Sequence, residues 1–139
     1  MTFVTGEIAA VTVGRLGLEP EQVIQEFGWD EDIDEAFRAQ VVEAVGGELE
    51  DEDYTGVVDH VLLWWRDGDG DLTDALVDSL GTLEEGGSIV LVTPTAGQDG
   101  EVDPAEVEEA ASTAGLHTSG TTKCGPAWVA TRLVSPRNR

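Results

Sequence analysis

The spacing of apolar side chains along the chain predicts an alternation of strands and helices. Residues 61–65 form an unbroken apolar run, Val-Leu-Leu-Trp-Trp, and residues 89–92 form a second one. Runs without polar alternation are typical of central strands that are covered on both faces. Together with shorter β-rich segments, the pattern predicts strands over 22–27, 57–65, 89–93, 116–123 and 128–134.

Three segments between these strands carry the helical pattern, in which apolar residues recur every three or four positions. The helices are expected over 33–45, 72–83 and 104–114. Asp30 or Asp32 is the expected cap of the first, Asp71 of the second, and Asp103, followed by proline, of the third. Glycines follow each segment and end it.

The order of these elements predicts an α/β fold, a three-layer and mostly parallel sheet of about five strands. Parallel neighbours require right-handed crossovers through the helices. Residues 124–126 are a compact hairpin connection, so the C-terminal hairpin is antiparallel, and we expect the antiparallel strand at the sheet edge. We expect an N-terminal arm over 1–20, a single α/β domain over 21–136 and a short tail over 137–139.

Composition narrows the class of protein. A chain of 139 residues with 40% hydrophobic residues and four tryptophans predicts one folded domain. No apolar run approaches the roughly 20 residues of a membrane span, and the mildly apolar start, residues 3–13, contains Glu7 and is not preceded by basic residues, so no secretory signal is expected. The single cysteine, Cys124, permits no internal disulfide, which favours a cytoplasmic location.

Charge is abundant and uneven. The chain carries 29 acidic and seven basic residues, a net charge of -22, and every acid lies at or before Glu109. This balance disfavours nucleic acid and anionic membranes and favours a basic protein partner. The C-terminal hairpin contains no acid, and an exposed strand edge of that kind can pair with that of a second copy to form a homodimer.

Three stretches carry a resemblance to a known family. Residues 26–38 (EFGWDEDIDEAFR), 61–66 (VLLWWR) and 86–89 (GGSI) resemble a family of acidic actinobacterial proteins known as a domain of unknown function. The resemblance covers residues 14–136. It implies similarity to the second half of the class I methyltransferase fold, and therefore a truncated Rossmann-like, methyltransferase-like scaffold.

The methyltransferase resemblance also assigns positions. Glu26 matches the acid that ends the first strand of such enzymes, and Gly28 matches the first glycine of the turn that approaches S-adenosylmethionine. Asp30 and Asp32 stand where further glycines are expected, with Trp29 between Gly28 and Asp30. The resemblance therefore implies a relative that has lost its cofactor, and we expect no cofactor.

Few motifs suggest chemistry. Asp67, Asp69 and Asp71 imitate the start of a calcium-binding loop, but Leu72 replaces the required glycine, so a helix-capping turn is favoured and no metal is expected. The two histidines, His60 and His117, have no evident nucleophile partner, and no phosphate-binding or hydrolase motif occurs. The thiol of Cys124, beside Lys123, is either partly activated or inert. An enzyme is disfavoured.

Binding residues are expected where the loops after the strands gather at the carboxyl end of the sheet. The predicted partner-binding or ligand-binding residues are Glu26, Gly28, Trp29, Asp30, Trp65, Asp67 and Asp69. Trp64 is expected in the core, whereas Trp65 fits either the core or the binding surface.

Two functions remain open at this point. The first is a non-enzymatic acidic binding or regulatory protein that engages a basic protein. The alternative is a protein that binds S-adenosylmethionine or a similar nucleoside, or a reduced methyltransferase. A third interpretation is that the acidity serves only solubility or tolerance of high salt.

Overall fold

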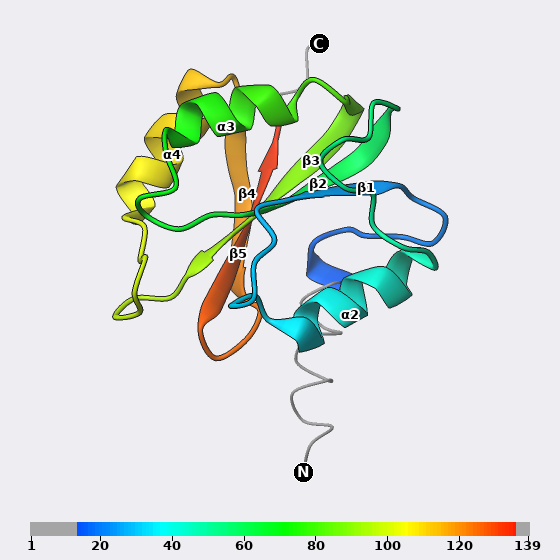
Figure 1. The fold of residues 1–139 in the computed structure, drawn as a ribbon. Helices are drawn as coiled ribbons and strands as arrows, with labels where there is room; N and C mark the ends of the chain where they lie inside the picture. The colour runs from blue at the N-terminus through cyan, green and yellow to red at the C-terminus, as the bar shows by residue number, and fades with distance from the viewer. Residues whose placement is uncertain (1–13, 136–139) are drawn as a thin grey trace.

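The protein folds around one five-stranded sheet with helices on both sides (Figure 1). The computed structural model describes residues 14–135. The strands are β1 (Ile24–Phe27), β2 (Val58–Trp64), β3 (Leu83–Pro94), β4 (His117–Lys123) and β5 (Trp128–Val134), and the helices are α2 (Glu35–Val45), α3 (Leu72–Ser79) and α4 (Pro104–Thr113). The predicted order of strands and helices is confirmed.

The strands lie in the order β1-β2-β3-β5-β4. β1, β2 and β3 are parallel neighbours, and β5 runs antiparallel to both β3 and β4. The expectation that the antiparallel strand lies at the edge is therefore wrong, because β5 is inserted between β3 and β4. The composition of the two strands explains this, since β5 buries Trp128, Ala130 and Leu133 whereas the Thr-rich β4 buries no residue.

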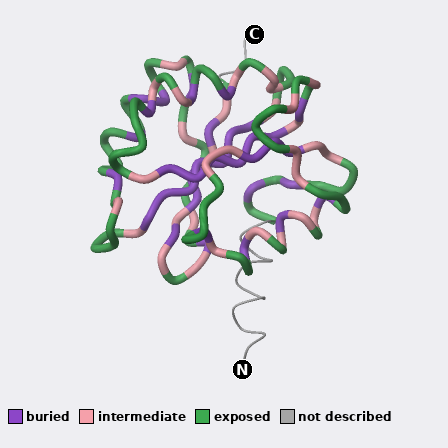
Figure 2. The backbone as a smooth tube through the Cα atoms, in the orientation of Figure 1, coloured by how far each residue is buried: buried purple, intermediate pink, exposed green. Residues whose placement is uncertain are grey.

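The sheet separates two apolar clusters, and the buried strands form the centre of the molecule (Figure 2). α2 covers one face, on which Phe37 packs edge-on against Trp64. α3 and α4 cover the other face, where Trp65 is 8% exposed. The two adjacent tryptophans thus point to opposite faces and both belong to the core, as the alternation of side chains along a strand requires.

Several predicted boundaries need correction. β3 begins at Leu83 rather than at residue 89, so Gly86 and Gly87, which were expected to end the preceding helix, lie within this strand. The cap of α2 is Asp34, whose side chain accepts from the backbone N–H of Phe37, and neither Asp30 nor Asp32 caps it. α3 ends at Ser79 rather than at residue 83, because Leu83 already pairs with Val58 as the first residue of β3. The apolar residues 80 and 83 continue the helical spacing but are used by a turn and a strand that pack on the same cluster.

β1 has hydrogen-bonded backbone neighbours on both sides. β2 lies on one side, and on the other the single residue Glu50 forms a parallel bridge with Gln25. The Gln25 side chain donates to the carbonyl oxygens of Asp51 and Tyr54, which holds the connector from α2 to β2 against β1. The chain thus leaves α2 on one face, passes the outer edge of β1 and returns as β2.

Residues 14–20 of the predicted N-terminal arm are described, and they are not separate from the domain. Leu16 is 2% exposed and Leu18 is 8% exposed, and both belong to the cluster under α2. The rest of the predicted arm and the predicted tail lie outside the described residues. No helix within residues 14–135 is long and apolar enough to cross a membrane.

Candidate functional site

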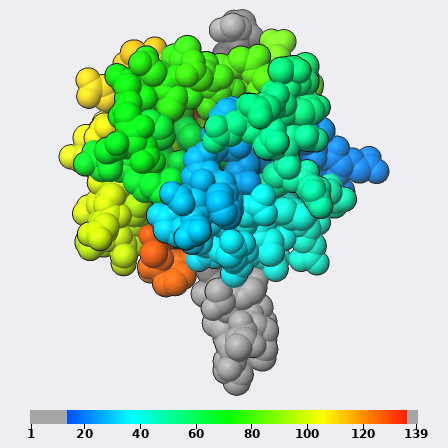
Figure 3. Space-filling view, viewed as in Figure 1, coloured from blue at the N-terminus to red at the C-terminus, as the bar shows by residue number. Residues whose placement is uncertain are grey.

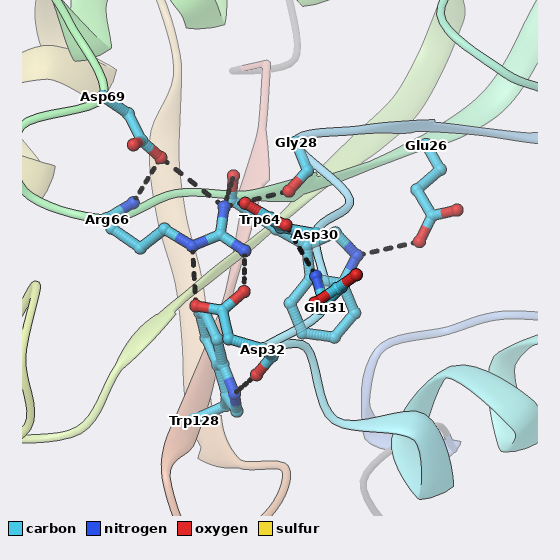
Figure 4. Close-up of polar contacts among 9 residues, drawn as sticks. All are labelled: Glu26, Gly28, Asp30, Glu31, Asp32, Trp64, Arg66, Asp69 and Trp128. Atoms are coloured by element: carbon cyan, nitrogen blue, oxygen red, sulfur yellow. Dashed lines mark hydrogen bonds and ion pairs between the residues drawn. The ribbon is translucent and has the colours of Figure 1, made fainter.

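Two loops meet at the carboxyl end of the sheet and are joined by one side chain, Arg66 (Figure 4). The loop after β1, residues 28–34, leads into α2, and the loop after β2, residues 65–71, leads into α3. Arg66 Nη1 donates to the carbonyl oxygen of Gly28 at 2.9 Å. Its Nε and Nη2 donate to the two oxygens of Asp32 at 3.1 and 2.6 Å. Arg66 therefore fixes both ends of residues 28–32.

Trp128, at the start of β5, contacts both Arg66 and the loop 28–32. The guanidinium carbon of Arg66 lies 5.3 Å from the centre of the Trp128 ring, a cation–π geometry. Trp128 Nε1 donates to the carbonyl oxygen of Asp32 at 3.2 Å, and its ring packs edge-on against Trp64. The loop is thus bound to a buried aromatic cluster as well as to Arg66.

The charges within the site stabilise one another. Although burial opposes the charge of Arg66, the carboxylates of Asp32 and Asp69 raise the pKa of its guanidinium above the ordinary value. The hydrogen bond from Arg66 lowers the pKa of Asp32, while partial burial acts in the opposite direction. Both groups are therefore ionised over the physiological pH range, and the bidentate geometry adds direction to their attraction.

The carboxylate of Glu26 is buried and hydrogen-bonded within the protein. It is 7% exposed, accepts a bidentate pair of hydrogen bonds from Arg38, and accepts a further one from Trp64 Nε1 at 2.8 Å. These contacts explain how an acid can end a buried strand, since a buried carboxylate requires charge pairing and hydrogen bonds. They leave its carboxylate out of reach of a partner.

Gly28 allows a close approach between two backbone segments of the protein itself, rather than between the backbone and a ligand. Its φ of +80° lies in the left-handed region, and a Cβ atom there would overlap the carbonyl oxygen of Trp64. Its N–H donates to Glu52 at 3.1 Å. The turn after β1 is therefore packed against β2 and the connector, so the glycine serves internal packing in this conformation.

The remaining predicted site residues divide into two groups. Trp29 is 52% exposed, and Asp30 on the same loop and Asp67 and Asp69 on the loop after β2 are also exposed. Trp65 is buried under α3 and α4, so it is not a surface residue of the site. In Figure 3 the loop after β1, in blue to cyan, lies at the surface between the green segment that includes α3 and the blue-green connector that precedes β2.

The aspartates of the β2–α3 loop form a turn that caps a helix. Asp69 accepts from the backbone N–H of Arg66 at 3.0 Å, and Asp71 accepts from that of Asp74 as the cap of α3. The capping function predicted for Asp71 is confirmed. Within residues 14–135 no group of three His, Cys, Asp or Glu side chains is arranged to hold a metal ion.

The candidate nucleophile and base lie apart and buried. His60 is hydrogen-bonded to Ser88 at 2.7 Å and to Gln22 at 2.8 Å, near the opposite end of β2 from Arg66. Cys124 is 2% exposed, and burial together with the charge of Asp34 raises the pKa of its thiol. Of the two alternatives that the sequence left for this thiol, the structure supports the inert one.

The sequence did not single out Arg66, Asp32 and Trp128 as a cluster. One signal was available: residues 1–109 contain all 29 acids but only three arginines, so an arginine directly after a central strand is unusual in this chain. The sequence does not predict which acid pairs with Arg66, because many acidic residues are equivalent candidates.

The profile of one protein family matches residues 13–137, almost the whole chain, and its description is "Protein of unknown function (DUF3052)". The chain belongs to the DUF3052 family. An uncharacterized protein of Mycobacterium tuberculosis, Rv2239c, is 53% identical over 138 residues, which cover 99% of this chain and 87% of the relative. A protein of Mycobacterium bovis, Mb2263c, shows the same identity and coverage.

The solved structures similar to this DUF3052 protein are methyltransferase-like in fold. The pyocyanin biosynthetic protein PhzM matches with a TM-score of 0.67 at 11% identity, over 94% of this chain and 55% of that one. The precorrin-6y C5,15-methyltransferase of Geobacter metallireducens matches with a TM-score of 0.62 at 13% identity, over 94% and 88% of the chains. At these identities the likeness shows the fold alone. The DUF3052 chain therefore has a truncated Rossmann-like methyltransferase fold, as the resemblance implied.

Proposed function

We propose that this protein is a non-catalytic acidic binding protein that engages a basic protein through the loop 28–32. The observation that carries the proposal is the anchoring of this loop by Arg66, which leaves Trp29 exposed between two fixed points. A tryptophan on a loop that is already ordered loses little conformational freedom on binding and supplies a large apolar contact.

The charges around Trp29 indicate the chemistry of the partner. Asp30 and Glu31 follow it in the loop and are exposed, and Asp67 is exposed on the neighbouring loop. Exposed carboxylates around an aromatic contact accelerate encounter with a basic surface and disfavour acidic ones. Arg66 does not cancel this field, because Asp32 and Asp69 already neutralise it locally.

The methyltransferase fold supports a second function, binding of S-adenosylmethionine or a similar nucleoside. The packing at the carboxyl end of β1 opposes it. The turn at Gly28 abuts the backbone of Trp64, and Arg66 crosses from β2 to Asp32 over the same end of the sheet. A ligand at this position would have to displace a bidentate ion pair.

Affinity capture from cell extract tests the proposal, with wild type, Trp29→Ala and, as a matched control, Val77→Ala. Val77 is 50% exposed on α3, outside the two loops. We expect a basic partner that is retained at about 0.05 M salt, released at about 0.5 M salt, lost with Trp29→Ala and kept with Val77→Ala. Equal capture by the Trp29→Ala variant would refute the proposal. Calorimetry with S-adenosylmethionine tests the alternative, and measurable heat would support it.

A further inference from the structure

A second surface, distinct from the loop 28–32, lies at the opposite edge of the sheet. Among the strands within residues 14–135, β4 pairs with β5 alone, so no strand lies beside the outer edge of its residues 117–122. Its sequence, His-Thr-Ser-Gly-Thr-Thr-Lys, contains no acid, and all its side chains are exposed or half-buried. An open edge of this kind can accept an additional extended chain through main-chain hydrogen bonds.

A bulge in β4 brings two threonines to the same side of the strand. The register with β5 shifts between Thr118 and Thr121. Residues three apart point to opposite faces of a regular strand, but here both threonines line the same hollow, which has a volume of about 160 Å³. Bulges at sheet edges commonly redirect side chains in this way next to binding sites.

The hollow combines an apolar floor with an acidic border. Val102 and Val107, the second of them on α4, are buried beside it, and Val129 of β5 also lines it. Glu101 and Glu108 stand at its border. One oxygen of Glu101 accepts from the backbone N–H of Gly97 at 3.0 Å, which fixes that carboxylate in position.

We propose that β4 and this hollow bind an extended basic segment of another protein. The backbone of the segment pairs with the outer edge of β4, and one lysine or arginine side chain enters the hollow. Its methylene stem lies on the valines, as long basic side chains do on apolar surfaces. Its charged head reaches the carboxylates of Glu101 and Glu108 and the hydroxyls of Thr118 and Thr121.

Charge complementarity selects this occupant over a second copy of the chain. Two copies, each with a net charge of -22, repel one another, whereas a basic segment is attracted to the whole protein and to the two glutamates in particular. The bulge also limits indiscriminate pairing of edges, which favours a specific segment. This surface does not use Trp29, so it can be tested independently of the function proposed above.

The probe is a fluorescent peptide of alternating lysine and valine, blocked at both ends, and its Kd for the full chain is measured by anisotropy. A second peptide has every other backbone nitrogen methylated, which removes the donors that strand pairing needs. We expect the methylated peptide to bind about tenfold or more weakly. A peptide with glutamate in place of lysine should not bind.

Two double variants separate the hollow from general attraction to a polyanion. Glu101→Gln with Glu108→Gln should weaken the lysine peptide about tenfold. Glu106→Gln with Glu109→Gln removes the same charge from residues that line a different hollow, between α3 and α4, and should change the Kd less than about twofold. Trp29→Ala should leave the Kd unchanged.

Several results would overturn the proposal. Equal binding of the methylated peptide would exclude strand pairing, and equal losses in the two double variants would reduce the effect to net charge. If sedimentation shows a dimer and the peptide competes with it or fails to bind, the occupant of β4 is a second copy rather than a basic segment.

Discussion

Trp64 donates a hydrogen bond of 2.8 Å from its indole nitrogen to Glu26, 38 residues earlier in the chain. The contact joins the ends of β1 and β2 and places a buried carboxylate beside the aromatic cluster of α2. In a methyltransferase-like scaffold this acid would be expected to face a ligand. Here Arg38 and Trp64 use its oxygens for the stability of the domain.

The first prediction concerns that hydrogen bond. Trp64→Phe keeps most of the ring but removes the donor, so we expect a loss of about 1–3 kcal/mol in the free energy of unfolding, measured by urea denaturation. The same substitution in a Glu26→Gln background should cost less, because the charged acceptor is gone. Equal costs in both backgrounds would show that the loss comes from packing alone.

Gly28 allows a test with a matched control. Gly28→Ala places a Cβ against the Trp64 carbonyl oxygen at a φ of +80°, and we expect a loss of at least about 2 kcal/mol in unfolding free energy. Gly46 has a similar φ of +76° at the end of α2, but open space where its Cβ would lie, so Gly46→Ala should cost only about 1 kcal/mol. Similar losses would mean that the contact with Trp64 can relax.

Arg66→Lys tests the anchoring of the loop 28–32. Lysine retains the charge but cannot form the bidentate pair with Asp32 or stack in the same way over Trp128. We expect faster hydrogen exchange of the amides of residues 28–33 and a loss of about 1–2 kcal/mol in unfolding free energy. Exchange in α4 should not change. An unaltered loop would show that Trp128 and the backbone hold it without the guanidinium.

These contacts mark where prediction from sequence stops. The central strands follow from apolar runs, and the caps Asp71 and Asp103 follow from local chemistry, because the determining residues are neighbours in the chain. The pairing of Arg66 with Asp32 joins residues 34 positions apart among many equivalent acids. Insertion of β5 between β3 and β4 likewise depends on which hairpin strand is more apolar, a comparison that the turn itself does not reveal.

Cys124 should be unreactive in the folded protein. Burial and the negative charge of Asp34 raise the pKa of its thiol, so the thiolate that alkylating reagents need is scarce. At about pH 8 we expect no labelling by iodoacetamide in native buffer and complete labelling in denaturant. Rapid native labelling would require that the hairpin residues 124–127 open frequently, since the thiol is otherwise covered.

His60 predicts how stability depends on pH. Its Nε2 donates to the side-chain oxygen of Gln22, and its Nδ1 is hydrogen-bonded to the Ser88 hydroxyl, which can donate to it when the ring is neutral. Burial lowers the pKa of His60, and the charge of Arg132 lowers it further, against the opposing effect of Asp59. Below the unfolded-state pKa of about 6.5, the unfolded chain binds a proton at His60 that the folded chain does not bind. The free energy of unfolding therefore decreases as the pH is lowered from about 6.5 towards the pKa of His60 in the folded chain.

The chain carries 29 acidic residues besides the histidines, so the effect of His60 is isolated by comparison with a variant. We expect the free energy of unfolding of wild type, measured by urea denaturation between about pH 7.5 and pH 5.5, to fall more steeply than that of His60→Gln, which cannot titrate there. His117, exposed at the start of β4, provides the control, and His117→Gln should keep the wild-type slope. If His60→Gln shows the same slope as wild type, the buried imidazole accepts a proton as readily in the folded chain as in the unfolded one.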